Sequence, residues 1–383
     1  MAKIVLILGG GVGGLVTANE LRAKLPRQHR VCLVDREETF VFSPSLLWLM
    51  TGVRTAKKIS RPLARLEKKG IERIRGEVEA IDPKRREVVV EGRTLGADYI
   101  VIALGADLAP DSVPGLSDAG HNFYSLPGAE GFRDAFHTFS GGVIVVLTAT
   151  PAYKCPAAPY EAAMLVEAAC RKRGIRDKTE ILFYAAEPGP MGVAGPEVSK
   201  AVRQMVESQG IRYYPEHSIA HVDGAGRVLK FSNGVEARYD LLAYVPPHRA
   251  PAVVEAAGLT SESGWISVDR STLETRFPGV YALGDVASIP LKLGKPLPKA
   301  GVFAHGEASV VVRNIAREIT GKGKAAEFRG DGECFIETGD GKAGFGRGNF
   351  FAEPLPQVKI HPPARRWHAA KVLFERDWLR RWF

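Results

Sequence analysis

Residues 2–36 read AKIVLILGGGVGGLVTANELRAKLPRQHRVCLVDR, and this stretch decides the fold of the first part of the chain. Its opening apolar run, IVLIL, is too short for a helix and has the length of a buried parallel strand. Glycines with the spacing G-x-G-x-x-G follow at once, at Gly9, Gly11 and Gly14. A helical apolar period comes next, and a second strand ends in the acid Asp35. The order strand, glycine turn, helix, strand and acid predicts a dinucleotide-binding unit.

Each part of this unit has a physical task. Glycines carry no side chain, so backbone N–H groups can approach a pyrophosphate at the helix N-terminus. Asp35 lies 21 residues after Gly14, where a carboxylate can accept hydrogen bonds from ribose hydroxyls. We include the next residue, Arg36, among the predicted cofactor contacts. These residues predict that an ADP-containing dinucleotide binds here.

The composition is that of an ordinary globular protein long enough for two domains or more. The chain has 383 residues, of which 45% are hydrophobic and 25% are charged. Four cysteines are too few for a secreted disulfide scaffold, so we expect a reducing compartment in which any disulfide is catalytic. We expect no signal peptide and no transmembrane helix. The net charge of +9 comes without a nucleic-acid-binding motif, so nucleic acid is not an expected partner.

A second strand–turn–helix unit begins at residues 141–147 (GGVIVVL). Before it, the first unit ends in a tight turn with Ala103 and Gly105, which we place near the cofactor. After it, a strand runs into Gly284-Asp285, and the first unit resumes. We therefore predict an α/β fold of two doubly wound domains, the second inserted in the first. The expected bounds are 1–110 with 250–325 for the first domain, 111–249 for the second, and 326–383 for a C-terminal region.

This arrangement resembles the flavoproteins that have two Rossmann-like dinucleotide-binding domains, over roughly residues 1–320. The resemblance implies that the first domain binds FAD and that Gly284 and Asp285 contact its ribityl and pyrophosphate region. Residues 40–43 contain no cysteine that could tether a flavin, so we expect non-covalent FAD. No metal site is predicted.

The second domain lacks the glycine turn that a nicotinamide dinucleotide needs. No glycine lies between Thr148 and Glu161, and three prolines there remove backbone N–H groups. We therefore expect no nicotinamide binding. Cys155 stands in this turn, close to a helix start whose dipole would favour a thiolate. Cys32 and Cys170 lie in a strand and a helix, and we expect them to be buried and unreactive.

Residues 154–161 read KCPAAPYE and resemble the Cys-x-x-x-Pro-Tyr-Glu stretch of the sulfide:quinone oxidoreductases and the related sulfide dehydrogenase flavoproteins. Cys334-Phe335 resembles the second redox cysteine of that family and its aromatic neighbour. Residues 42–48 (FSPSLLW) are similar to its Pro-Ser-x-Pro-Trp loop, and residues 298–301 (PKAG) to its flavin-contacting Lys-Thr-Gly segment. Two features of many members are missing, a third cysteine before the second domain and a histidine near residues 189–192.

The resemblance implies a reaction and a set of site residues. Sulfide is oxidised to zero-valent sulfur or polysulfide through a Cys155–Cys334 redox disulfide, and FAD passes the electrons to membrane quinone. Glu161 is the candidate proton shuttle, with a surface helix acid as the alternative. Lys299 is the candidate residue that stabilises reduced flavin, and Gly301 of the same segment contacts the cofactor. The candidate quinone contacts are Phe335, Gly301 and Phe351.

Residues 365–383 are predicted to form a C-terminal amphipathic helix. At 100° per residue, one face gathers the aromatic side chains of Trp367, Phe374, Trp378 and Trp382. With basic residues around it, an available aromatic face suits the headgroup region of an anionic membrane. The resemblance also implies monotopic membrane attachment at this helix. The alternative is that both faces pack within a dimer or against the core.

The leading hypothesis is a sulfide:quinone oxidoreductase attached to the cytoplasmic side of the plasma membrane. Its expected partners are sulfide, polysulfide, the quinone pool and the membrane surface, and a homo-oligomer is left open. Three alternatives remain. The flavoprotein subunit of a flavocytochrome c-type sulfide dehydrogenase would pass its electrons to a cytochrome. A type II NADH:quinone oxidoreductase would accept NADH, and a flavin redox sensor would signal through its thiols to a partner.

Overall fold

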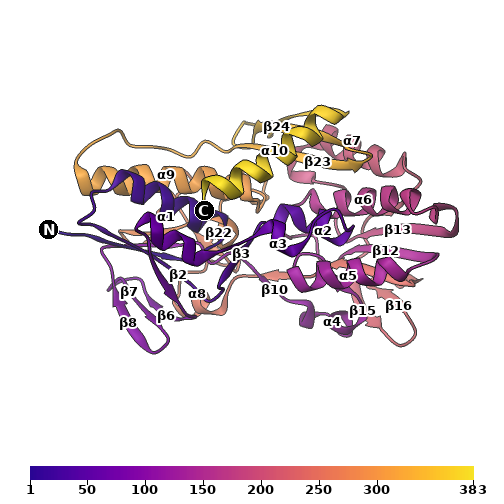
Figure 1. Ribbon diagram of the computed structural model, residues 1–383, viewed down its shortest axis with the longest axis horizontal. Helices are drawn as coiled ribbons and strands as arrows, with labels where there is room; N and C mark the ends of the chain where they lie inside the picture. The colour runs from indigo at the N-terminus through magenta and orange to yellow at the C-terminus, as the bar shows by residue number, and fades with distance from the viewer.

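Two α/β domains lie side by side in the computed structural model, which describes residues 1–383 (Figure 1). The first domain centres on a parallel sheet with the strand order β21-β9-β1-β2-β5. Its strands are β1 (Ile4–Leu8), β2 (Arg30–Asp35), β5 (Glu72–Arg75), β9 (Tyr99–Ile102) and β21 (Val280–Ala282). Helices α1 (Val12–Lys24) and α9 (Gly301–Thr320) pack together on one face. The other face is covered by an antiparallel sheet of β6 (Val78–Asp82), β7 (Glu87–Val90) and β8 (Arg93–Gly96).

The apolar run of β1 alternates between two buried layers. Val5 and Ile7 pack in the core that contains Leu15 of α1. Leu6 and Leu8 belong instead to the core beneath the antiparallel sheet. Because both faces of the strand are covered, every residue in the run is apolar. The parallel strand predicted from the length of this run is confirmed.

The second domain repeats this plan with a sheet of order β11-β18-β12-β13-β14. Its strands are β11 (His121–Asn122), β12 (Gly142–Thr148), β13 (Thr179–Ala185), β14 (Arg212–Tyr214) and β18 (Leu241–Val245). The helices that pack on one side are α5 (Leu126–Thr138), α6 (Ala158–Lys172) and α7 (Pro196–Glu207). The other side is covered by the antiparallel strands β15 (Ile219–Asp223), β16 (Val228–Phe231) and β17 (Glu236–Arg238).

The chain passes between the domains twice. It leaves the first domain at β10 (Asp107–Leu108) and returns at β19 (His248–Arg249), and these two strands pair antiparallel. Strand β21 then joins the first sheet beside β9. The second domain is therefore inserted in the first, which confirms the predicted fold class of two Rossmann-like domains.

Short elements connect these layers. They are the helices α2 (Leu46–Met50), α3 (Ala56–Ile59), α4 (Leu116–Ala119) and α8 (Ala252–Ala256), and the strands β3 (Thr39–Val41), β4 (Ser60–Pro62), β20 (Ile266–Ser267) and β22 (Ala287–Ser288). Helix α2 reaches the second domain, where it packs against α5 and α6. One buried apolar core is therefore continuous from the first domain to the second.

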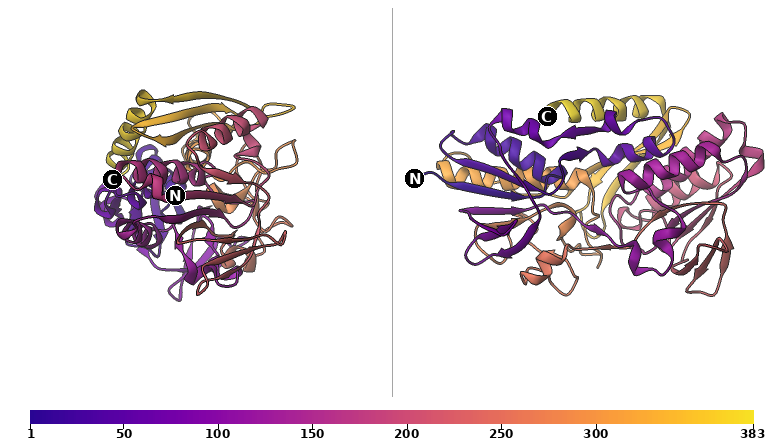
Figure 2. Two further views of the ribbon diagram at one scale, coloured as in Figure 1. Left: turned by 90° about the vertical axis from the view of Figure 1, so that its right-hand side faces the viewer. Right: turned by 60° about the horizontal axis from the view of Figure 1, so that its bottom comes forward.

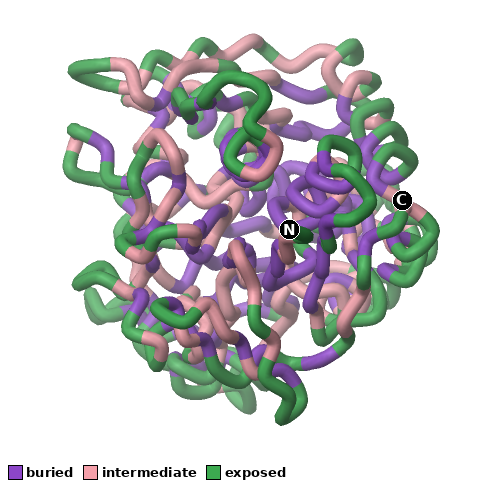
Figure 3. Tube along the Cα trace, turned by 90° about the vertical axis from the view of Figure 1, so that its left-hand side faces the viewer, coloured by how far each residue is buried: buried purple, intermediate pink, exposed green.

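The C-terminal region joins both domains. It consists of an antiparallel sheet of β23 (Asp331–Gly339), β24 (Lys342–Asn349) and β25 (Gln357–Ala364), followed by α10 (Arg365–Arg381). Figures 1 and 2 show this region along one side of the molecule. Strand β23 packs against α6 of the second domain and α9 of the first. In Figure 3 the buried segments gather in the interior and exposed loops surround them.

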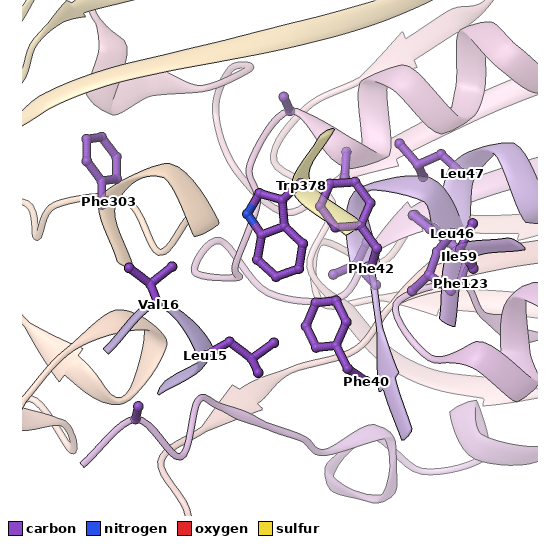
Figure 4. Close-up of a cluster of buried hydrophobic side chains, with 14 of the residues drawn as sticks. Leu15, Val16, Phe40, Phe42, Leu46, Leu47, Ile59, Phe123, Phe303 and Trp378 are labelled. Carbon is purple, nitrogen blue, oxygen red and sulfur yellow. The ribbon is translucent and has the colours of Figure 1, made fainter. Parts of the chain in front are cut away.

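The predicted C-terminal helix forms, but its aromatic face is not free. Trp378 and Trp382 are only 4% and 3% exposed. The Trp378 ring stacks on Phe40 with 4.9 Å between centroids and lies 5.2 Å from Phe42 (Figure 4). The predicted available stripe is therefore wrong for these two tryptophans, because the first domain and its aromatic side chains cover them. None of the helices combines the length and the apolar character that crossing a lipid bilayer requires.

Candidate active site

A large cavity of about 1720 Å³ is lined by residues of both domains and of the C-terminal region. The predicted site residues that line it are Gly9, Gly11, Asp35, Ala103, Gly105, Cys155, Glu161, Gly284, Asp285, Lys299, Gly301, Cys334 and Phe335. The predicted residues that do not line it are Gly14, Arg36 and Phe351. The fold thus gathers at one cavity residues from nearly the whole length of the chain.

The first glycine turn has a geometry that only glycine allows. Gly9 has a φ of 100°, and a Cβ there would lie 2.4 Å from the carbonyl oxygen of Ala103. A Cβ at Gly14 would lie 1.8 Å from the carbonyl oxygen of Gly9. Gly14 therefore permits α1 to pack closely on the turn, and it does so without facing the cavity. A Cβ at Gly11 would meet no atom within 4 Å, so the backbone there is open to a ligand.

Two helices begin at this end of the cavity. Val12, the first residue of α1, and Gly301, the first residue of α9, both line it. Neither helix has a side-chain N-cap, so N–H groups of both first turns are available to an anion. The turn after β21 is fixed because Gly284 N donates a hydrogen bond of 2.6 Å to the buried carboxyl of Glu307. This end of the cavity therefore suits a pyrophosphate, with Asp285 beside it.

Asp35 and Arg36 differ in their surroundings. Asp35 Oδ1 accepts a hydrogen bond of 2.7 Å from Glu37 N, and its other oxygen accepts one from Gly10 N. The carboxylate is thus held at the cavity wall. The Arg36 guanidinium lies at the surface, 3.6 Å from the carboxylate of Glu37 and 3.4 Å from that of Glu77. Arg36 lies in the bend after β2 and does not line the cavity, and its contact with the cofactor stays a prediction.

Cys155 and Cys334 come from positions 179 residues apart, and both thiols are free. Cys155 lies between β12 and α6 with a φ of 49°, a left-handed conformation that is uncommon outside glycine. Its N–H donates a hydrogen bond of 2.6 Å to the carbonyl of Lys299. Its carbonyl accepts hydrogen bonds from Tyr124 Oη at 3.0 Å and from Ala158 N at 2.9 Å. Neighbouring elements thus fix this strained residue at the cavity wall.

Burial controls the ionisation of both thiols. It raises the pKa of Cys155 to about 12, and the carboxylate of Glu161 adds to the increase. Burial also raises the pKa of Cys334, and the second cause is the nearby thiol of Cys155. Both cysteines line the same cavity. The N–H of Ala158, the first residue of α6, lowers the pKa of Cys155 in the direction predicted for the helix start, but desolvation outweighs it.

A buried ion pair lies next to the thiols. Glu161 is 3% exposed, so the alternative of a surface helix acid is wrong. Lys371 Nζ of α10 donates a hydrogen bond of 2.5 Å to Glu161 Oε2, which also accepts one of 2.9 Å from Glu337 N. The Lys371 charge lowers the pKa of both thiols against the effect of burial. Lys371 was not among the predicted site residues, because nothing in the local sequence distinguishes it from the other basic residues of α10.

Lys299 is engaged with the protein itself. Its ammonium donates hydrogen bonds to the carbonyls of Asp285 at 2.6 Å and Ala287 at 2.9 Å. The same nitrogen lies 3.6 Å from the centroid of the Trp265 ring. Burial lowers the pKa of Lys299 to about 8. The side chain lines the cavity, and its contact with reduced flavin stays a prediction.

An aromatic group marks another part of the cavity. Phe42, Phe335 and Phe374 line it, with ring centroids 5.9 Å apart for Phe42 and Phe374 and 6.4 Å apart for Phe335 and Phe374. Phe351 does not belong to this group. The Arg270 guanidinium lies over the Phe351 ring at 4.6 Å, beside a separate small pocket. Phe351 thus lies outside the large cavity, and its contact with quinone stays a prediction. Phe374, which was not among the predicted residues, lines the cavity.

The second domain keeps an acid where a dinucleotide-binding fold places its ribose contact. Glu187 follows the end of β13, and its carboxylate accepts hydrogen bonds from three hydroxyl groups. Thr148 donates at 2.7 Å, Tyr160 donates at 2.6 Å, and Tyr153 is the third donor. Tyr153 comes from the turn that lacks glycine. The carboxylate of Glu187 is thus hydrogen-bonded within the protein, and the absence of nicotinamide binding stays a prediction.

Comparison with known proteins places the chain in a family. The family model described as pyridine nucleotide-disulphide oxidoreductase matches residues 3–308. The chain is 29% identical to the sulfide-quinone reductase of Aquifex aeolicus, over 99% of this chain and 91% of that protein. It is 26% identical to the mitochondrial sulfide:quinone oxidoreductase of Dictyostelium discoideum, over 87% of this chain and 75% of that protein. The solved structure of the Aquifex aeolicus sulfide:quinone oxidoreductase matches with a TM-score of 0.90 and 26% identity, covering 100% of this chain and 91% of that one.

The site geometry and the family agree on the cofactor. The glycine turn, the two helix N-termini and the turn at Gly284-Asp285 fit the pyrophosphate of FAD, and Asp35 fits its ribose. The family match spans more than half of the chain. The protein is an FAD-dependent oxidoreductase, and it belongs to the pyridine nucleotide-disulphide oxidoreductase family.

Proposed function

We propose that the protein oxidises sulfide at Cys155 and Cys334 and passes the electrons by way of FAD to a quinone. One observation carries this proposal: two thiols from distant parts of the chain lie at the wall of the cavity that holds the FAD-binding turns. Relatives that cover almost the whole chain are named for sulfide and quinone, which supports the same reaction. A cytochrome as acceptor, NADH as donor and a signalling role are the alternatives.

The sulfur chemistry needs the two cysteines as a disulfide. Hydrosulfide attacks one cysteine sulfur, a new S–S bond forms, and the bond between Cys155 and Cys334 breaks, so the other cysteine leaves as a thiolate. The products are a cysteine persulfide and a cysteine thiolate. Loss of two electrons and one proton from this pair joins the cysteines again, with the sulfur atom from sulfide between them. Further sulfide carries that sulfur away as polysulfide.

Residues around the thiols assist these steps. A buried thiolate is costly, and the ammonium of Lys371 offsets part of that cost. Glu161 is hydrogen-bonded to the same ammonium. It is the group placed to move the proton that is lost when the cysteines join again. FAD, when bound, accepts the two electrons and delivers them to the quinone. Lys299 supplies positive charge at the cofactor end of the cavity.

The quinone is proposed to enter at Phe374. This side chain lines the cavity and is 45% exposed, so the cavity meets the surface there. The rings of Phe42 and Phe335 are its neighbours and offer flat faces on which a quinone ring can stack. The proposed electron acceptor therefore reaches the cavity from the side that carries α10.

Attachment to the membrane is proposed at the same side. Leu373 and Phe374 of α10 are 63% and 45% exposed, and Val53 is 52% exposed. Val53 is held near α10 because its neighbour Arg54 forms a 2.9 Å ion pair with Glu375. The exposed basic residues of the helix are Arg365, Arg366, Arg376, Arg380 and Arg381. This patch, rather than the tryptophan stripe, supplies the apolar and basic surface that suits a membrane at its cytoplasmic face.

Serine substitutions at the two thiols test the proposed function. Cys155→Ser and Cys334→Ser should each lower sulfide-dependent quinone reduction by at least about 100-fold, because a disulfide can no longer form. The flavin should stay bound, as its absorption spectrum would show. Cys170→Ala is the matched control, since Cys170 is buried in α6 and lies outside the cavity. Turnover above a tenth of the wild-type rate in either serine variant would contradict the disulfide mechanism.

A further inference from the structure

His248 has a ring nitrogen for which the protein provides no partner. It lies in β19, where the chain returns to the first domain, and its side chain lines the cavity. Its Nδ1 is 2.8 Å from the carbonyl oxygen of Pro246. A carbonyl can only accept a hydrogen bond, so Nδ1 carries the proton and Nε2 holds a lone pair. Nε2 is buried and makes no hydrogen bond within the protein, and a buried polar atom of this kind calls for a ligand.

The imidazole lies beside the residues that hold Cys155. The Tyr124 ring meets His248 edge-on with 5.8 Å between centroids, and Tyr124 Oη donates its hydrogen bond to the carbonyl of Cys155. The charged groups that face the imidazole are Lys154, the residue before Cys155, and Lys299. Positive charge here favours an anion. Burial, followed by the Lys154 charge, lowers the pKa of His248 to about 4, so the ring is neutral at physiological pH and Nε2 keeps its lone pair.

We propose that Nε2 of His248 binds the S–H group of hydrogen sulfide and accepts its proton as the sulfur attacks Cys155. This inference rests on the proposed function, because it supplies the base for the first step of that reaction. The sulfur of hydrogen sulfide bonds to the Cys155 sulfur, and the bond between Cys155 and Cys334 breaks. The electron pair of the broken bond leaves on Cys334 as a thiolate. One proton of hydrogen sulfide stays on the new persulfide, and the other moves to His248.

Neutral hydrogen sulfide needs a proton acceptor when it attacks, whereas ionised hydrosulfide does not. Hydrogen sulfide loses its first proton near neutral pH, so acidic solutions present mainly the neutral molecule, which is a weak nucleophile. A neutral imidazole can remove the proton during attack, whereas the neighbouring lysines cannot when they are charged. Above neutral pH the substrate arrives as hydrosulfide. His248 then has no proton to remove. Lys154 attracts the anion, and Lys299 does so below its pKa of about 8.

The pH dependence of flavin reduction distinguishes this function from a structural one. Anaerobic reduction of the flavin by sulfide is measured across the first ionisation of hydrogen sulfide in the wild type, His248→Ala and His248→Gln. Both variants should be slower by about 100-fold or more at acidic pH, and the deficit should shrink towards the wild-type rate at alkaline pH. Reoxidation by quinone should not change. His248→Gln guards against a folding defect, and His221→Ala, at an exposed position, is the matched control.

Other results would overturn the inference. An equal deficit at every pH would mean that His248 only supports the structure, and an unchanged rate at acidic pH would mean that it takes no proton. Added imidazole should restore part of the acidic rate of His248→Ala, and failure to do so would count against proton transfer. Failure of the proposed function looks different, because then sulfide would not reduce the wild-type flavin or Cys155→Ser would still turn over.

Discussion

Lys371 places a positive charge that lowers the pKa of both cavity cysteines, Cys155 and Cys334. Its ammonium is buried against Glu161, with only 8% of the lysine side chain exposed. The same charge lowers the pKa of Cys155 and of Cys334, whereas burial raises both. A buried ion pair adds little net stability, but removing one partner leaves the other as an uncompensated buried charge. Lys371 therefore has two effects: it lowers the pKa of the thiols, and its ion pair with Glu161 holds α10 against the second domain.

Lys371→Met separates these effects. It should raise the pKa of both thiols further, so their alkylation by iodoacetamide at a given pH should slow. It should also lower the free energy of unfolding by about 3–5 kcal/mol, because Glu161 loses its partner. The double variant Lys371→Met with Glu161→Gln should recover much of that stability and also much of the alkylation rate, because it removes the Glu161 charge that raises both thiol pKa values. Lys172→Met, at an exposed position, is the control, and alkylation as fast as in the wild type would refute the role of Lys371.

At the scale of elements, α10 shows what a helical pattern can and cannot reveal. The helix was predictable from its length and periodicity, but its apolar residues surround most of the axis, so the pattern did not identify the buried face. Phe40 and Phe42 lie more than 300 residues earlier in the chain. Their rings cover Trp378 and so determine which face of the helix is buried. The partner of Lys371 is likewise 210 residues away. Such contacts arise from the tertiary fold and leave no local signal.

Two variants of α10 should change different properties, one the stability of the protein and the other its binding to membranes. Trp378→Ala should lower the free energy of unfolding by about 3–5 kcal/mol, because it removes a buried ring that stacks on Phe40. Leu373→Ser with Phe374→Ser should change stability little, since both side chains are exposed, and should weaken binding to anionic vesicles about tenfold or more. Urea unfolding and vesicle co-sedimentation measure the two quantities. Unchanged vesicle binding of the double variant would contradict attachment at this patch.

At the scale of the whole molecule, the fold was largely predictable and the details of the site were not. Strand, glycine turn and acid follow local rules, so Gly9, Gly11 and Asp35 could be placed from their spacing. The cysteines could be placed because their sequence contexts resemble a known family. The desolvation of side chains in the cavity depends on how the two domains and the C-terminal region pack around it. The raised thiol pKa of Cys155 and the free nitrogen of His248 therefore appear only in three dimensions.

The cavity brings together the two thiols, the FAD-binding turns and the aromatic opening. We therefore expect electrons to pass from sulfide to FAD and from FAD to quinone. Anaerobic stopped-flow absorbance of the flavin band follows this transfer directly, with sulfide and NADH added separately and a short-chain quinone added afterwards. We predict that sulfide bleaches the flavin, that NADH does not, and that quinone restores the band. Bleaching by NADH alone, or a sulfide-reduced flavin that quinone fails to reoxidise, would contradict this prediction.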